Sequence, residues 1–146
     1  MILEIRVKNC FAFNEQIMFS MKADMRNKKF ASNVHRGKNF NVLKTAGVYG
    51  SNNVGKTCLI KCINAIKFAM QNKDTKLLSN LFTDNELCEL GITFLHSGRT
   101  YSYDFRYDEN EEAYTYEKFM EISKDQYGNE KEDIWLFRDN EKGSYF

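Results

Sequence analysis

The stretch "VYGSNNVGKTCLIKCI", residues 48–63, decides the fold of this chain. Four of its residues follow the spacing G-x-x-x-x-G-K-T: Gly50, Gly55, Lys56 and Thr57. A strand, a tight loop and a helix in this order point several backbone N–H groups and a helix N-terminus at one place, which suits a phosphate group. The sequence therefore predicts a strand–loop–helix unit whose loop binds an anion.

The loop residues have separate expected roles. Gly50 allows the chain to turn off the strand, and Gly55 lets the backbone approach a phosphate because it has no Cβ. Lys56 would place its charge on the β- and γ-phosphates, and the hydroxyl of Thr57 would bind Mg²⁺. The residues predicted to bind nucleotide are Gly50, Ser51, Asn52, Asn53, Val54, Gly55, Lys56, Thr57 and Cys58. The alternative is a loop that keeps this shape without a ligand.

The residues before the loop predict a hairpin, a basic loop and a short strand. Apolar and charged residues alternate over 2–8, and apolar residues recur at every second position over 17–21, which indicates two antiparallel strands. Residues 24–40 carry five Lys/Arg and one acid without a clear period, so we expect a long loop. Its charge either reaches the phosphates or is only solvated surface. "LKTAGVYG", residues 43–50, predicts a short buried strand that leads into the glycine loop.

The pattern after Lys56 is helical and then becomes that of strands. The apolar helix face is expected to hold Leu59, Cys62 or Ile63, Ile66, and Ala69 or Met70, and the other face Lys61, Asn64, Lys67 and Gln71. The spacing over 75–88 predicts a second short helix. From residue 90 onward we expect antiparallel strands, with a hairpin turn at Ser97-Gly98. The aromatic residues with a period of two are expected to share one sheet face and to pack there: Tyr101, Tyr103, Phe105 and Tyr107.

Composition indicates one soluble domain. The chain has 146 residues, of which 42% are hydrophobic, and no apolar run approaches the roughly 20 residues of a membrane span. The N-terminus alternates apolar and charged residues, so we expect no signal peptide and a cytoplasmic location. The four cysteines form no C-x-x-C pair and are predicted to be buried, reduced thiols rather than metal ligands: Cys10, Cys58, Cys62 and Cys88.

Charge divides the chain into two halves. Residues 1–76 hold 14 Lys/Arg and 4 Asp/Glu, a net of +10, and residues 77–146 hold 7 and 16, a net of −9, which together give the total of +1. A basic half suits a polyphosphate ligand and leaves nucleic acid open as a partner. Equally, the two halves could neutralise each other across the folded surface.

Two motifs carry a resemblance to ABC-type ATPases. The loop G-S-N-N-V-G-K-T, with Asn52 at its third position, looks like the ABC ATPase loop more than the Ras-like one. The hairpin "LEIRVKNCFAFNEQIMFSM" before it resembles the start of SMC-type and OLD-type ATPases. The order of segments over nearly the whole chain is similar to bacterial AAA-type/ABC-fold ATP-binding proteins, including abortive-infection proteins. In contrast to relatives that read "NFRSF", Phe11 stands where an arginine is common, and Asn53 replaces the second glycine of "GPNGAGKS".

The resemblance implies an α/β (α+β) fold, the P-loop NTPase head of ABC type. Residues 1–146 would be one incomplete N-terminal lobe, with the hairpin, Walker A loop and helix in 1–75 and a short helix and antiparallel strands in 76–146. It further implies ATP and Mg²⁺ as ligands, a homodimer of heads in the complete protein, and a role in phage defence.

The catalytic half of such a head is not found in the sequence. "LLSN", residues 77–80, lacks the glycines of an L-S-G-G segment, and "IWLFRD", residues 134–139, has no Asp-Glu pair at its end. We therefore expect ATP hydrolysis only when a C-terminal half is present. The alternative is a non-catalytic module that binds a nucleotide or a partner.

Overall fold

The computed structural model describes residues 1–146 except 27–28, 38–39, 72, 74–75 and 146. The described part contains one α-helix, α1 (Lys56–Met70), and a 3-10 turn, η1 (Ala31–Asn33). Its strands are β1 (Ile2–Lys8), β2 (Ile17–Ser20), β3 (Val34–Arg36), β4 (Asn41–Leu43), β5 (Leu87–His96), β6 (Arg99–Asp108), β7 (Ala113–Lys124), β8 (Glu130–Asp139) and β9 (Gly143–Tyr145). No helix in these described ranges is long and apolar enough to cross a bilayer.

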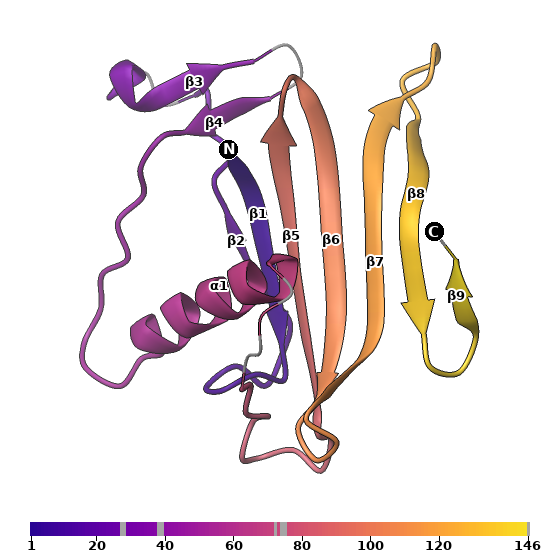
Figure 1. Cartoon of the computed structure of the whole chain (residues 1–146). Coiled ribbons are helices and arrows are strands. Elements are labelled where there is room, and N and C mark those ends of the chain that lie inside the picture. Colours follow the sequence, from indigo (N-terminus) through magenta and orange to yellow (C-terminus); the bar gives the residue numbers. More distant parts are fainter. Residues whose placement is uncertain (27–28, 38–39, 72, 74–75, 146) are drawn as a thin grey trace.

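Seven strands form one antiparallel sheet in the order β2-β1-β5-β6-β7-β8-β9 (Figure 1). The predicted N-terminal hairpin is confirmed, since β1 and β2 pair antiparallel. The predicted antiparallel strands after residue 90 are confirmed as well. Both parts belong to the same sheet because β1 pairs with β5, with Ile5 opposite Ile92. The fold is thus a mixed one, mostly antiparallel sheet with a single helix.

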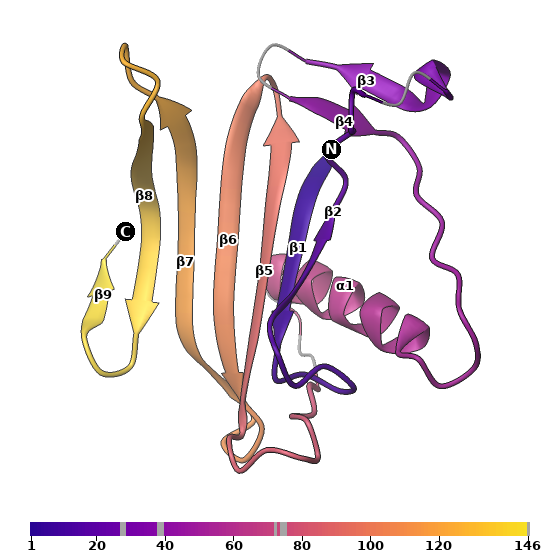
Figure 2. The ribbon, with the colours of Figure 1, turned by 180° about the vertical axis from the view of Figure 1, so that it is seen from behind.

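Helix α1 covers one face of the sheet over β1 and β5. It lies on the side turned to the viewer in Figure 1 and behind the strands in Figure 2. Its buried residues are Leu59, Cys62, Ala65 and Ile66, so the predicted apolar face is confirmed at its centre. The residues expected on the other side are exposed: Lys61, Asn64, Lys67 and Gln71. This burial stabilises the helix by about 1.5–3 kcal/mol for each large aliphatic side chain.

The core lies between α1 and the alternate residues of three strands. Leu3, Ile5 and Val7 of β1 are at most 2% exposed, as the alternation predicts. The aromatic residues of β6 continue this face and are all buried: Tyr101, Tyr103, Phe105 and Tyr107. Their packing role is therefore confirmed. The opposite face of the same strands carries charged residues, and among the described residues no α-helix covers it.

The predicted second helix over 75–88 is wrong. Residues 76–86 contain no helix in the structure, and β5 begins at Leu87, while 74–75 lie outside the described residues. The apolar residues of this segment face different ways, since Leu77 is 2% exposed and Leu81 is 94% exposed. Long-range hydrogen bonds take up the backbone groups that a helix would need, including Phe11 N–H to Leu78 carbonyl at 2.9 Å.

The predicted buried strand over 43–50 is also wrong. Strand β4 ends at Leu43, and residues 44–50 are exposed and belong to no strand (Figure 1). Residues 44–50 belong to neither sheet, because the seven strands of the large sheet pair with one another and β3 pairs with β4.

The basic segment 24–40 is not wholly a loop. It contains η1 and β3, and β3 pairs with β4 as a small separate hairpin. Part of this segment, with Lys28 and Lys38, lies outside the described residues.

Candidate functional site

The glycine loop leads directly into the N-terminus of α1. The helix begins at Lys56, and its N-cap is Gly55 in a left-handed conformation with φ of 90°. No side chain caps this end, and the first turn contains no acidic residue. The first N–H groups of the helix and the positive end of its dipole are therefore left for an anion. Asn53 also has positive φ, 63°, which asparagine tolerates better than most residues.

Lys56 closes the loop from inside. Its ammonium Nζ donates to the carbonyl of Gly50 at 2.8 Å and to the carbonyl of Ser51. An ammonium group has three N–H donors, so Lys56 can bind both loop carbonyls and still have a donor for a ligand. Lys56 thus links the N-terminus of α1 to the start of the loop. A phosphate group would lie between these two parts.

The turn between β1 and β2 supports the loop from below. A Cβ on Gly55 would lie 3.3 Å from the ring of Phe13 and 3.7 Å from the Cβ of Ala12. Any side chain at Gly55 would therefore strain both the backbone, because of its positive φ, and this contact. Gly55 is required here by two independent features of the fold.

A hollow of about 420 Å³ lies at this place, which we call the loop hollow. Its lining contains seven residues, six of them predicted from the sequence: Ala12, Asn52, Asn53, Gly55, Lys56, Thr57 and Cys58. Gly50 and Ser51 reach the site through Lys56, while Val54 is 54% exposed and packs near Gly50. Ala12 belongs to the site although the sequence pattern gives no signal for it.

The donor set of the loop hollow fits a phosphate group better than a bare metal ion. Its lining includes a lysine, backbone N–H groups and the hydroxyl of Thr57 but no acidic side chain. In the described ranges no three His, Cys, Asp or Glu side chains gather as a metal site. A Mg²⁺ ion bound here would therefore depend on Thr57 together with the oxygens of a bound nucleotide.

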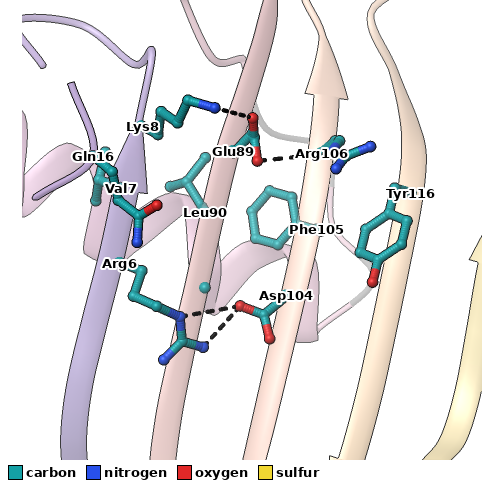
Figure 3. Close-up of a pocket in the computed structure, with 11 residues that line it drawn as sticks. Arg6, Val7, Lys8, Gln16, Glu89, Leu90, Asp104, Phe105, Arg106 and Tyr116 are labelled. Atoms are coloured by element: carbon teal, nitrogen blue, oxygen red, sulfur yellow. Dashed lines mark hydrogen bonds and ion pairs between the residues drawn. The ribbon is translucent and has the colours of Figure 1, made fainter. Parts of the chain in front are cut away.

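A second polar site lies on the sheet face opposite α1 (Figure 3). Its groove of about 240 Å³ surrounds Arg6, whose guanidinium donates to Asp104 Oδ1 at 2.7 Å, to Ser102 Oγ at 2.9 Å and to Thr93 Oγ1 at 2.7 Å. Arg6 and Asp104 stand on β1 and β6, on either side of Gly91 in β5. The absence of a side chain at Gly91 lets the pair meet across the middle strand.

The charges in this groove are already paired with each other. Lys8 lies 2.9 Å from Glu89, and Arg106 lies 3.7 Å from the other oxygen of Glu89 (Figure 3). A network so fully satisfied rigidifies a sheet rather than binding a ligand. The sequence reasoning missed it, although an isolated glycine inside a strand, such as Gly91, is a signal of close approach.

Three of the four cysteines meet beneath α1. Cys10, Cys62 and Cys88 are 0% exposed and free, and the sulfur atoms of Cys62 and Cys10 are 3.9 Å apart. The hydrogen bonds of Cys62 and Cys88 and the burial of the group raise the pKa of the Cys10 thiol, so this thiol stays neutral. These thiols act as small apolar side chains, while Cys58 lines the loop hollow.

Comparisons with known proteins add nothing to this geometry: no protein-family model matches the chain, and a search of curated proteins finds no match.

Proposed function

We propose that this chain binds ATP with Mg²⁺ through Gly50–Cys58. The observation that carries the proposal is the uncapped N-terminus of α1 with Lys56 turned onto the carbonyls of Gly50 and Ser51. In this proposal Lys56 leaves those carbonyls for the β- and γ-phosphates, the loop N–H groups hold the β-phosphate, and Thr57 binds the metal. Bound Mg²⁺ would neutralise part of the negative charge of the phosphates.

The chain is further proposed to be the N-terminal lobe of an ABC-type ATPase head. Support comes from residues 44–50, which precede the loop without pairing to a strand. Val48 and Tyr49 in this segment are 45% and 93% exposed, which is unusual for apolar residues next to a binding loop. A further lobe that pairs with this segment would bury them and would complete the head that the sequence resembles. Such heads would then pair as a homodimer around nucleotide.

A second candidate is a binding module without turnover. The observation that favours it is the lining of the loop hollow, which holds no carboxylate to orient water or the metal. Such a module would bind a nucleotide or only a partner, and where it binds nucleotide the two candidates differ only in what happens afterwards.

Calorimetric titration of the purified chain with ATP·Mg²⁺ tests the shared step. Lys56→Ala should weaken binding about tenfold or more, because it removes charge-assisted hydrogen bonds worth roughly 1.5–3 kcal/mol. Lys67→Ala is the matched control, since Lys67 is exposed on the same helix and is not part of the loop hollow. Equal affinity of the Lys56→Ala variant and the parent chain would contradict the proposal.

A further inference from the structure

Two large apolar residues occupy the central positions of a tight turn between α1 and β5. The N–H of Thr83 donates to the carbonyl of Asn80 at 3.2 Å, which places Leu81 and Phe82 at the two central positions. Their side chains are 94% and 90% exposed. Turn corners usually carry Gly, Pro, Asn, Asp or Ser, so two apolar residues here indicate a contact surface. We call this feature the Leu81–Phe82 turn.

Asn80 fixes the shape of this turn. It is 4% exposed, its amide group donates to the carbonyl of Phe11 at 2.9 Å, and its side-chain oxygen accepts from the N–H of Phe82 at 3.0 Å. Asn9 Oδ1 accepts from the N–H of Asn80 at 3.2 Å and from the hydroxyl of Thr83 at 2.6 Å. The turn is therefore held in one conformation before it meets a partner, which lowers the entropy cost of binding.

A hollow of about 490 Å³ lies beside the turn on the outer side of α1, and we call it the helix hollow. Phe11, Phe68 and Leu78 contribute apolar walls, and Lys61 lies at its rim with its ammonium 5.3 Å from the centre of the Phe11 ring. Leu78 and Phe11 line the hollow, and the carbonyl of Phe11 accepts from the amide group of Asn80 in the turn. The projecting turn and the hollow thus belong to one surface of the molecule.

The charges around the two features are opposite. Asp84 and Glu86 follow the turn and are exposed, while Lys61 and Lys76 line the helix hollow. Lys76 lies 3.1 Å from Glu112, whereas within the described part of the chain Asp84, Glu86 and Lys61 form no ion pair. The turn therefore carries negative charge at its side, and the hollow carries positive charge at its rim.

We propose that the Leu81–Phe82 turn of one copy binds in the helix hollow of a second copy, which gives a two-fold symmetric homodimer. A surface that carries both a projection and a matching hollow pairs with itself by two-fold rotation, and both contacts then form at once. Asp84 of each copy lies near the partner's Lys61 in this arrangement. The dimer uses the outer side of α1 and not the loop hollow, so it forms without nucleotide and goes beyond the proposed function.

Sedimentation equilibrium of the 146-residue chain, without nucleotide and over a rising concentration series, tests the dimer. The parent chain should shift from monomer to dimer. Phe82→Ser should raise the dissociation constant tenfold or more, because a buried aromatic at the centre of an interface is a typical hot spot and each substitution acts twice. Tyr127→Ser is the matched control, since Tyr127 is 81% exposed in the distant turn between β7 and β8 and should leave the dimer unchanged.

Exchanging the charges of Lys61 and Asp84 distinguishes this dimer from dimers of other geometry. Lys61→Glu alone and Asp84→Lys alone should each weaken the dimer about fivefold, since each places like charges together at two symmetric positions. The double variant with both changes in one chain should regain the parent affinity. A chain that stays monomeric at all concentrations, as it would if a different segment or protein covers this surface, overturns the proposal. So does a dimer that survives Phe82→Ser, or a double variant that is not restored. Lys56→Ala should leave the dimer intact, which separates this test from that of nucleotide binding.

Discussion

Gly91 is the residue on which the polar network of the open sheet face depends. A Cβ at this position would overlap Asp104 Oδ1 and would lie 2.9 Å from a terminal guanidinium nitrogen of Arg6. Gly91→Ala should therefore separate the Arg6–Asp104 pair and lower the free energy of unfolding by about 1–3 kcal/mol. Urea unfolding measures the change.

The control for Gly91→Ala is the same substitution in a chain that also carries Asp104→Ala. If the cost arises from the overlap with Asp104, Gly91→Ala should cost much less in that background than in the parent chain, and the difference is the coupling energy. Equal costs in both backgrounds would show that the glycine is needed only for its backbone.

Tyr103 makes the free energy of unfolding depend on pH in the alkaline range. Burial, followed by the hydrogen bond to Glu117 at 2.6 Å, raises the pKa of Tyr103 above its ordinary value of 10.0. The folded state then holds this proton more tightly than the unfolded state, so the stabilisation is complete below pH 10 and is lost as pH rises further. Tyr103→Phe should reduce the slope of unfolding free energy against pH above 10.

At the scale of elements, Asn80 decides the shape of the segment 76–86. Asn80→Ala removes its hydrogen bonds to Phe11 and Phe82 and leaves the partly buried carbonyl of Phe11 without that partner. The expected loss is about 1–3 kcal/mol, together with faster hydrogen exchange at Phe82 and Thr83. Asn129→Ala, in an exposed turn, should cost less. Unchanged exchange at Phe82 would show that the turn is held by other contacts.

The elements that the sequence predicts well are those with a local, repeated pattern. Helix α1 and strands β5 to β8 follow from apolar spacing and from turn residues such as Ser97-Gly98, because each of these signals lies within a few residues. The segment 75–88 also has helix-like spacing, but the deciding hydrogen bonds come from Asn9 and Phe11, far away in the sequence.

The candidate site also contains residues that the sequence predicts and one that it does not. The loop 50–58 is recognisable because its chemistry is contained in a short spacing, whereas Ala12 reaches the loop hollow only through the packing of the β1–β2 turn. The strand predicted over 43–50 fails because strand pairing is a property of the neighbours and not of the segment. The Arg6–Asp104 pair likewise depends on the order of β1, β5 and β6 in the sheet.

The whole molecule is expected to bind nucleotide without turning it over. Phosphoryl transfer requires the metal, the water and the developing charge to be positioned together, and the lining of the loop hollow supplies only the cradle, Lys56 and Thr57. A phosphate-release assay on the purified chain should therefore match the enzyme-free control. Turnover on the order of 1 per second that Lys56→Ala abolishes would reveal a catalytic carboxylate elsewhere in the chain.

The position of β1 in the sheet also affects the order in which the molecule folds. Strands β6 to β9 pair only with their neighbours along the chain, so each of these contacts closes a short loop. β1 must instead find β5, with β2, β3, β4 and α1 lying between them in the sequence, and closing so long a loop costs more chain entropy. During synthesis β1 leaves the ribosome well before its partner β5. The edge of β1 that faces β5 thus stays open until Leu87–His96 has been made.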